Sequence, residues 1–231
     1  MIFAHRGASG ICFENTISAF EEAVRQKADG IEIDVQLTAD GVPVIVHDVD
    51  LYRIAGIRRS ISSLYLSELE NIKIGKKFLR YLFGHRIPTL REIVSFCELN
   101  SVALNIELKE TVSERPESLK EILEMAMVLD RVHISSFDPV LLIKAKAIEP
   151  TMETALLLKK KTTEWDRLDK YDFADGFHFH KRLCKEPYIS PLVASGKKLR
   201  VYGMTGKEAT AVSPPSFIDG WITDYPSRFN K

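Results

Sequence analysis

The chain has 231 residues, of which 45% are hydrophobic and 28% charged, as is ordinary for a globular protein with a sizeable core. Its 32 basic and 32 acidic residues cancel, which argues against nucleic acid or an anionic membrane as the main partner. No run of residues approaches the roughly 20 apolar residues that a membrane span needs, so we expect no stable membrane insertion.

The cysteines and the start of the chain bear on the cellular compartment. Cys12, Cys97 and Cys184 are widely spaced and form no CxxC pattern, so we interpret them as reduced thiols rather than as a disulfide framework or a zinc site. A strand-like run, Ile2-Phe3-Ala4, directly follows Met1 where a signal peptide would stand. We therefore expect a cytoplasmic protein, and the sequence indicates no oligomeric state.

Short apolar runs alternate along the chain with amphipathic stretches. Helices with one apolar face are expected at 16–26, 89–99, 118–129 and 139–148, the first after an Asn15-Thr16 cap signal. Eight strands alternating with helices favour a (β/α)8 barrel, the TIM-barrel class, over an open doubly wound sheet. These strands are expected near residues 2–4, 31–37, 102–108, 132–136, 153–158, 176–180, 199–204 and 220–223.

One strand-like run, residues 42–47, breaks this alternation. Asp40-Gly41 lies between it and the preceding strand, and Asp-Gly between apolar runs predicts a hairpin. With the turn centred there, positions that sum to about 81 face each other, so His47 is expected opposite Asp34. The hairpin would return His47 to the barrel mouth and leave eight strands for the barrel.

We interpret residues 48–88 as a small insertion over the barrel mouth of a single domain, residues 1–231. The insertion contains a predicted short helix at 61–69 and a basic, aromatic segment at 76–83. The aromatic residues of this segment are expected to anchor the insertion to the barrel, and a lid or a contact with a lipid tail is the alternative. They are Phe78, Tyr81 and Phe83.

Charged residues stand two apart at the ends of two predicted strands. Glu32 and Asp34 share one face of the second strand, and Glu107 and Lys109 have the same spacing on the next barrel strand. TIM-barrel active sites lie at the carboxyl ends of the strands, so the three carboxylates should converge there and repel each other unless a cation neutralises them. Solvated strand-end acids are the alternative. Oxygen ligands favour one divalent cation, Mg²⁺ or Ca²⁺, over zinc.

Two histidines and two cationic residues are predicted around these acids. Arg6 and Lys109 would hold a phosphate, and His5 and His47 could exchange protons near neutral pH. We interpret the other histidines as packed or exposed bystanders, although the alternation of two of them allows one to face the barrel mouth. They are His85, His133, His178 and His180.

Taken in order, these motifs resemble the glycerophosphodiester phosphodiesterase signature over nearly the whole chain. Each motif alone is weak, whereas the ordered set is specific. The set comprises His5-Arg6-Gly7, Glu14-Asn15-Thr16, Ala19-Phe20, Glu32-Ile33-Asp34-Val35, Thr38 with Asp40-Gly41, His47-Asp48, Pro88-Thr89-Leu90, Glu107-Leu108-Lys109, Ser135-Ser136-Phe137 and Thr223-Asp224-Tyr225-Pro226.

The resemblance implies a (β/α)8 barrel, a divalent metal, and hydrolysis of small glycerophosphodiesters to glycerol 3-phosphate and an alcohol. Carried over by motif, the metal ligands are Glu32, Asp34 and Glu107, with Asn15 near the site. His5 and His47 become the acid–base pair, and Arg6 and Lys109 the phosphate contacts.

Two positions depart from the family pattern. Phe13 stands where the family often has proline, and Tyr202-Gly203-Met204 replaces a Trp-Thr-Val-Asn-like sequence that lines the pocket. Trp221 or Tyr202 could compensate for the missing aromatic, with packing between barrel and helices as the alternative for both. Two other functions stay open: a lysophospholipase D or phosphoinositide-type phospholipase in a related barrel, and a non-catalytic phosphodiester-binding barrel.

Overall fold

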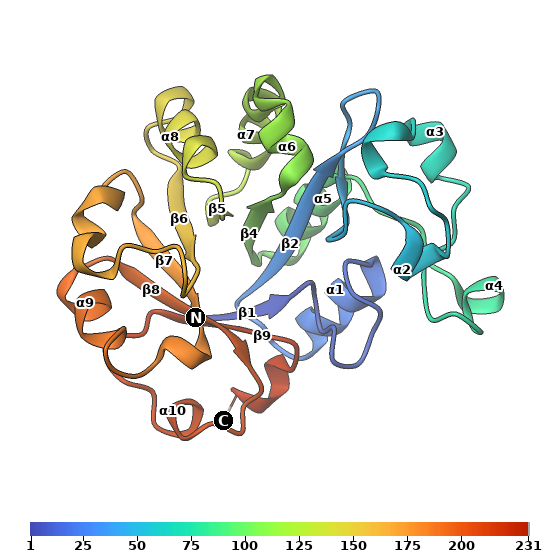
Figure 1. Ribbon diagram of the computed structural model, residues 1–231. Helices are drawn as coiled ribbons and strands as arrows, with labels where there is room; N and C mark the ends of the chain where they lie inside the picture. The colour runs from blue at the N-terminus through green and yellow to red at the C-terminus, as the bar shows by residue number, and fades with distance from the viewer. Residues whose placement is uncertain (231) are drawn as a thin grey trace.

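The computed structural model describes residues 1–230, in which eight parallel strands form a closed barrel (Figure 1). The strands follow the order β1-β9-β8-β7-β6-β5-β4-β2, and β1 also pairs with β2, which closes the circle. The predicted (β/α)8 barrel is therefore confirmed. Its strands are β1 (Ile2–His5), β2 (Gly30–Leu37), β4 (Ala103–Leu108), β5 (Val132–Ser136), β6 (Glu153–Leu158), β7 (Gly176–His180), β8 (Lys198–Met204) and β9 (Gly220–Thr223).

Helices cover the outside of the barrel, and α1 begins at the predicted Asn15-Thr16 cap. Thr16 accepts a hydrogen bond from the Ala19 amide, and Thr89 and Glu92 form a reciprocal capping box. The helices after β6 are short, and the longest of them, η3, has seven residues. In chain order the helices outside residues 46–87 are α1 (Ile17–Arg25), α5 (Leu90–Asn100), α6 (Glu110–Glu114), η2 (Pro116–Ser118), α7 (Leu119–Ala126), α8 (Pro139–Ile148), η3 (Trp165–Tyr171), η4 (Lys181–Leu183), α9 (Ile189–Ala194), α10 (Ala209–Val212) and η5 (Pro226–Arg228).

The predicted hairpin forms, but its register differs by one residue from the prediction. Strand β3 (Pro43–Ile45) pairs antiparallel with β2 so that facing positions sum to 80, as in Val35 opposite Ile45. His47 is therefore not opposite Asp34; the amide of Val46 donates to the Asp34 carbonyl instead, at 2.9 Å. The cause is a longer turn, in which Thr38 pairs with Val42 and Gly41 adopts a left-handed φ of 82°.

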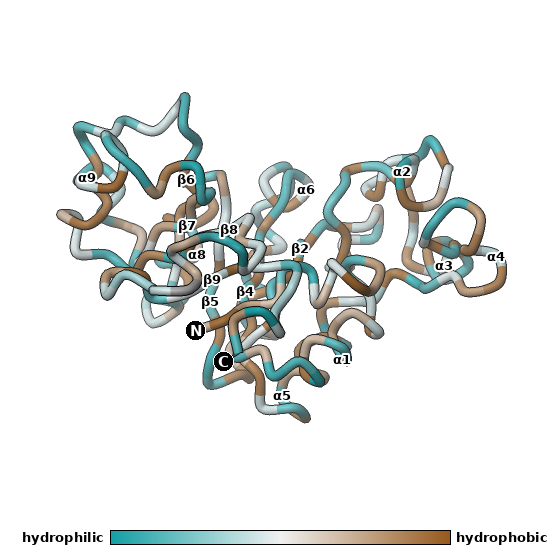
Figure 2. Tube along the Cα trace, turned by 90° about the horizontal axis from the view of Figure 1, so that it is seen from below, coloured by the Kyte–Doolittle hydropathy of each residue, from teal (hydrophilic) through white to brown (hydrophobic). Residues whose placement is uncertain are grey.

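Residues 46–87 build a second, smaller core beside β2 and β3. The predicted helix at 61–69 is divided into η1 (Ile61–Ser63) and α3 (Leu66–Leu69), which accompany α2 (Tyr52–Ala55) and α4 (Arg80–Phe83). Figures 1 and 2 both place α2, α3 and α4 to one side of the barrel. The buried residues of this core are aliphatic: Val44, Val46, Leu51, Ile54, Ala55, Ile61, Leu64, Leu69, Ile74 and Ile87.

The aromatic residues of this insertion do not anchor it to the barrel, contrary to the prediction. Phe78 is 89% exposed, Tyr81 87% and Phe83 70%. The small aliphatic core is complete without them, so nothing requires their burial. Among residues 1–230, no helix combines the length and the apolar character that crossing a membrane would require.

Candidate active site

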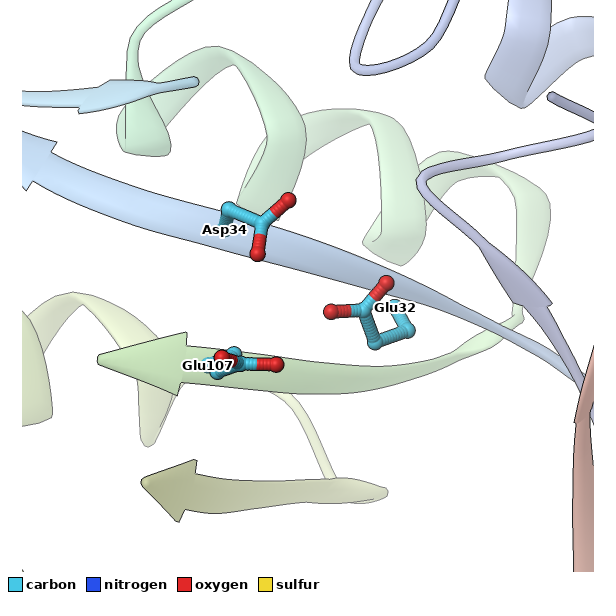
Figure 3. A group of neighbouring side chains, drawn as sticks. All are labelled: Glu32, Asp34 and Glu107. Carbon is cyan, nitrogen blue, oxygen red and sulfur yellow. The ribbon is translucent and has the colours of Figure 1, made fainter. Parts of the chain in front are cut away.

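Three buried carboxylates meet inside the barrel, at the carboxyl ends of β2 and β4. Glu32 and Asp34 project from β2, and Glu107 from the position of β4 that pairs with Asp34 (Figure 3). One oxygen of each side chain lies within 4.8 Å of the others, as the ligands of a single ion must. The predicted convergence of these acids is thus what the structure shows.

Burial and mutual repulsion set the protonation of these acids. Burial, reinforced by the charge of Asp34, raises the pKa of Glu32 to about 8 and also raises the pKa of Glu107. For Asp34, burial acts in the same direction, but Arg6 and Lys109 outweigh it and lower the pKa. The two cationic neighbours therefore do not suffice to keep all three carboxyl groups readily ionised, and a bound cation would favour their ionised forms.

Two carboxylate oxygens are free to bind a cation. Glu32 Oε1 and Asp34 Oδ1 are buried and accept no hydrogen bond from the described residues, although Lys109 Nζ lies 3.4 Å from the Asp34 oxygen. Buried polar atoms are normally paired, so these oxygens need a ligand. Carboxylate oxygens are the donors that Mg²⁺ and Ca²⁺ prefer, and this trio fits such an ion.

The two predicted phosphate contacts flank the acids. Arg6 Nε lies 2.9 Å from Asp34 Oδ2, and Lys109 Nζ lies 2.8 Å from Glu107 Oε1. Both side chains line the same cavity, of about 220 Å³. Asn15 instead lies behind the acids, where its amide donates to Asp34 Oδ2 at 2.8 Å and orients that carboxylate.

The loop after β1 is shaped to present Arg6 to the site. The backbone amide of Arg6 donates to Glu32 Oε2 at 2.9 Å, and the φ of Arg6, 55°, is left-handed. Gly7 follows with a φ of 79°, and a Cβ there would lie 2.6 Å from the Ala19 carbonyl carbon of α1. Only glycine permits this approach of the loop to the helix.

His5 and His47 each form a hydrogen bond between Nδ1 and a carboxylate, and both histidines line the cavity. His5 pairs with Asp224 at 2.7 Å and His47 with Asp48 at 2.8 Å. An ionised carboxylate only accepts hydrogen bonds, so Nδ1 carries the proton and Nε2 is left for proton exchange. The pKa of His5 is raised because Glu32 and Asp224 together outweigh the opposing effect of burial.

The remaining cavity wall combines predicted and unpredicted residues. Tyr202 lines it, whereas Trp221 does not, because its neighbour Ile222 faces inward and Trp221 packs outward on Phe229. The prediction of Trp221 as a pocket residue is therefore wrong. The unpredicted lining residues are Asn105, Phe137, Leu157, His178 and Ile222.

His178 is the lining residue that sequence reasoning had set aside as a bystander. It is fully buried, and neither ring nitrogen has a hydrogen-bond partner among the described residues. Burial, with a smaller effect of His133, holds its pKa well below the usual value, so the ring is neutral. The spacing of two residues along β7 allowed either His178 or His180 to face the barrel mouth, and in the structure it is His178 that lines the cavity.

An arginine of the insertion connects the two histidine loops. Arg53 Nε donates to Asp48 Oδ2 at 2.6 Å, and the two terminal guanidinium nitrogens donate to Glu14. Glu14 in turn accepts from Arg6 at 3.1 Å. The carboxylate behind His47 is thereby tied to the loop that presents Arg6, although the two lie on different elements.

One cavity is surrounded by buried carboxylates, two cationic side chains and two histidine–carboxylate pairs. This combination defines a TIM-barrel hydrolase equipped for an anionic substrate.

The sequence model of the glycerophosphoryl diester phosphodiesterase family matches residues 5–228. A glycerophosphodiester phosphodiesterase of Bacillus altitudinis is 32% identical over 98% of this chain and 95% of its own length. One from Caldanaerobacter subterraneus is also 32% identical, over 98% of this chain and 94% of its own.

Solved structures agree with this assignment. An Oleispira antarctica phosphodiesterase in complex with the product sn-glycerol-3-phosphate is 29% identical, with a TM-score of 0.87 over 100% of this chain and 95% of that one. A Thermotoga maritima glycerophosphodiester phosphodiesterase gives 27% identity and a TM-score of 0.80, over 99% and 96% of the two chains. The chain belongs to the glycerophosphoryl diester phosphodiesterase family and is an enzyme of that class.

Proposed function

We propose that this enzyme hydrolyses glycerophosphodiesters to glycerol 3-phosphate and an alcohol, with one divalent cation, Mg²⁺ or Ca²⁺, held by Glu32, Asp34 and Glu107. One observation carries the proposal: His5 and His47, each oriented by a carboxylate, line one cavity together with Glu32 and Glu107 of the acidic trio. The Oleispira relative, whose structure holds sn-glycerol-3-phosphate, supports the choice of product.

Charge on the substrate phosphate is met from two sides. When bound, the cation would stabilise negative charge on the non-bridging oxygens. Arg6 can add a forked hydrogen-bond donor and Lys109 a point charge, and both already lie at the edge of the acidic trio. Largely buried cations of this kind stabilise a developing charge more strongly than they would in bulk water.

Proton transfer is assigned to the two Nε2 atoms. One histidine removes a proton from the nucleophile, and the other protonates the departing alkoxide oxygen as the bond from phosphorus to that oxygen breaks. We assign the second role to His47. The nucleophile is either water or the neighbouring glycerol hydroxyl, which would pass through a cyclic phosphate that water then opens.

The test is release of glycerol 3-phosphate from a panel of glycerophosphodiesters, before and after treatment with a chelator. We expect activity that the chelator abolishes and that Mg²⁺ or Ca²⁺ restores. Activity that resists the chelator would refute the metal assignment. Adding a lysophospholipid to the panel tests the main rival, since preference for that lipid would indicate a lysophospholipase D. Binding without turnover would indicate a non-catalytic barrel.

We further propose that residues 1–231 act as one phosphodiesterase domain, with residues 48–88 as its insertion. The tie between Arg53 and Glu14 supports this, because it joins the insertion to the barrel at the site. We propose the cytoplasm as the compartment, a choice supported by three free cysteines.

The tie made by Arg53 leads to a testable prediction. Replacing Arg53 with methionine is expected to lower kcat by roughly tenfold, because Asp48 would no longer be held in place to orient His47. The pH–rate profile should shift as well, since the charge beside the His47–Asp48 pair changes. Arg59→Met is the matched control: Arg59 is equally exposed, lies in the same insertion, and pairs with Glu68 away from the cavity. Equal behaviour of the two variants would contradict a positioning role.

A further inference from the structure

The insertion ends in a cluster of exposed apolar side chains, which we call the apolar tip. Single exposed hydrophobic residues are normal on a protein surface, but contiguous apolar patches mark interaction sites. The tip lies within six consecutive positions and so forms one patch. Its members are Phe78 (89% exposed), Leu79 (50%), Tyr81 (87%), Leu82 (79%) and Phe83 (70%).

Positive charge surrounds the apolar tip. Residues 73–86 contain five lysine or arginine residues and no acidic residue, although the whole chain is neutral. Lys76 and Lys77 directly precede the tip and are exposed. Aromatic side chains flanked by lysine are typical of segments that lie in the interface of an anionic bilayer, where the rings enter the headgroup region and the ammonium groups reach the phosphates.

The position of the tip suits a flat partner. Figures 1 and 2 both show α4 at the outer edge of the insertion, on the side away from the barrel. A flat surface can therefore meet the tip without first meeting the barrel. A hollow of about 250 Å³ beside the tip is lined by Leu79 and Phe83 and also by Ile11 and Phe13 of the loop after β1. That loop presents Arg6 to the site, so the tip is continuous with the active-site face.

We propose that the apolar tip docks this enzyme reversibly on an anionic lipid surface. A second copy of the chain is a poorer occupant, since a two-fold contact through the tip would bring the exposed Lys76 and Lys77 of both copies together. Docking of this kind needs no spanning helix, in keeping with the helices of residues 1–230. The proposal goes beyond the proposed reaction, and binding can be measured without turnover.

The experiment is sedimentation of the purified full chain with vesicles of phosphatidylcholine alone or mixed with phosphatidylserine. We expect binding to the mixed vesicles only, and weaker binding as salt is added. A triple variant, Phe78→Ser with Tyr81→Ser and Phe83→Ser, should lower the partition coefficient at least roughly tenfold. Lys76→Gln with Lys77→Gln should weaken binding and flatten its salt dependence.

The matched control is Leu99→Ser, which removes an apolar side chain that is 85% exposed on α5. It should bind vesicles as the wild type does. All variants should hydrolyse glycerophosphocholine at the wild-type rate, which shows that they fold. Failure of the wild type to bind the mixed vesicles would overturn the proposal. So would wild-type binding by the triple variant, or a wild-type dimer that the triple variant loses while neither binds lipid.

Discussion

Replacing His47 with alanine is expected to lower kcat roughly 10²- to 10⁴-fold while leaving the affinity for a divalent cation unchanged. The His47 ring is held by Asp48 at Nδ1, so its loss removes proton transfer at Nε2 and leaves the acidic trio intact. His5→Ala should cause a loss of similar size. The measurement is steady-state hydrolysis at saturating Mg²⁺ or Ca²⁺.

The leaving group separates the two histidines. A p-nitrophenolate leaving group needs no proton, so His47→Ala should retain far more activity with a p-nitrophenyl diester than with glycerophosphocholine. His5→Ala should be impaired with both substrates. The control is His85→Ala, since His85 stacks on Phe13 away from the cavity. If His47→Ala keeps wild-type turnover of glycerophosphocholine, the two-histidine proposal fails. If it is instead His5→Ala that retains far more activity with the p-nitrophenyl diester, then His5 is the acid and His47 the base.

Glu32→Gln is expected to have opposite effects on the metal-free and the metal-bound enzyme. Without a cation, ionisation of the buried Glu32 side chain beside Asp34 is unfavourable, so the amide, which carries no charge, should raise Tm at pH 8 by roughly 3–8 °C. The amide can still accept the hydrogen bond that the Arg6 amide donates. With a cation bound, the wild type should have the higher Tm, since the variant lacks one charged ligand. The variant should also lose at least roughly 100-fold of its activity.

The pH dependence of this stability follows from the pKa of Glu32. In the folded, metal-free enzyme that pKa is raised from 4.5 to about 8. The folded state therefore binds the extra proton between these values, and wild-type stability should fall as pH rises from about 4.5 through about 8. The Tm difference between Glu32→Gln and wild type should grow over the same window. Calorimetry with chelator measures it, with Glu121→Gln on α7 as control; a constant difference would contradict this pKa.

Periodicity in the sequence was enough to predict the barrel and the convergence of its acids. Parallel strands place residues two apart on one face, so Glu32, Asp34 and Glu107 could be assigned to the interior without coordinates. The hairpin was predictable too, but its register depended on a turn one residue longer than Asp-Gly alone implies, which shifts every facing pair. His47 still reaches the cavity because it lies two residues beyond the end of β3.

The predictions that failed concern residues for which the sequence allowed two placements, and only side-chain packing in the folded protein decides between them. Trp221 and Ile222 are both apolar neighbours on β9, and only the closed barrel determines which of them faces inward. His178 was not assigned to the site because a histidine on an apolar strand is usually a packed residue, and the alternation alone did not separate it from His180. The aromatic residues at 78–83 were expected to be buried because aromatic side chains usually are, whereas their actual exposure depends on an aliphatic core elsewhere in the insertion.

The pair between His5 and Asp224 joins residues 219 positions apart. His5 ends the first barrel strand, β1, and the carboxylate that orients it directly follows the last barrel strand, β9. A nascent chain can thus carry both histidines and all three acids long before the proton-transfer group is complete. In the barrel β9 lies between β1 and β8, beside the strand that carries His5. Removing the segment that carries Asp224 would therefore leave His5 without its orienting carboxylate, even with both histidines and all three acids present.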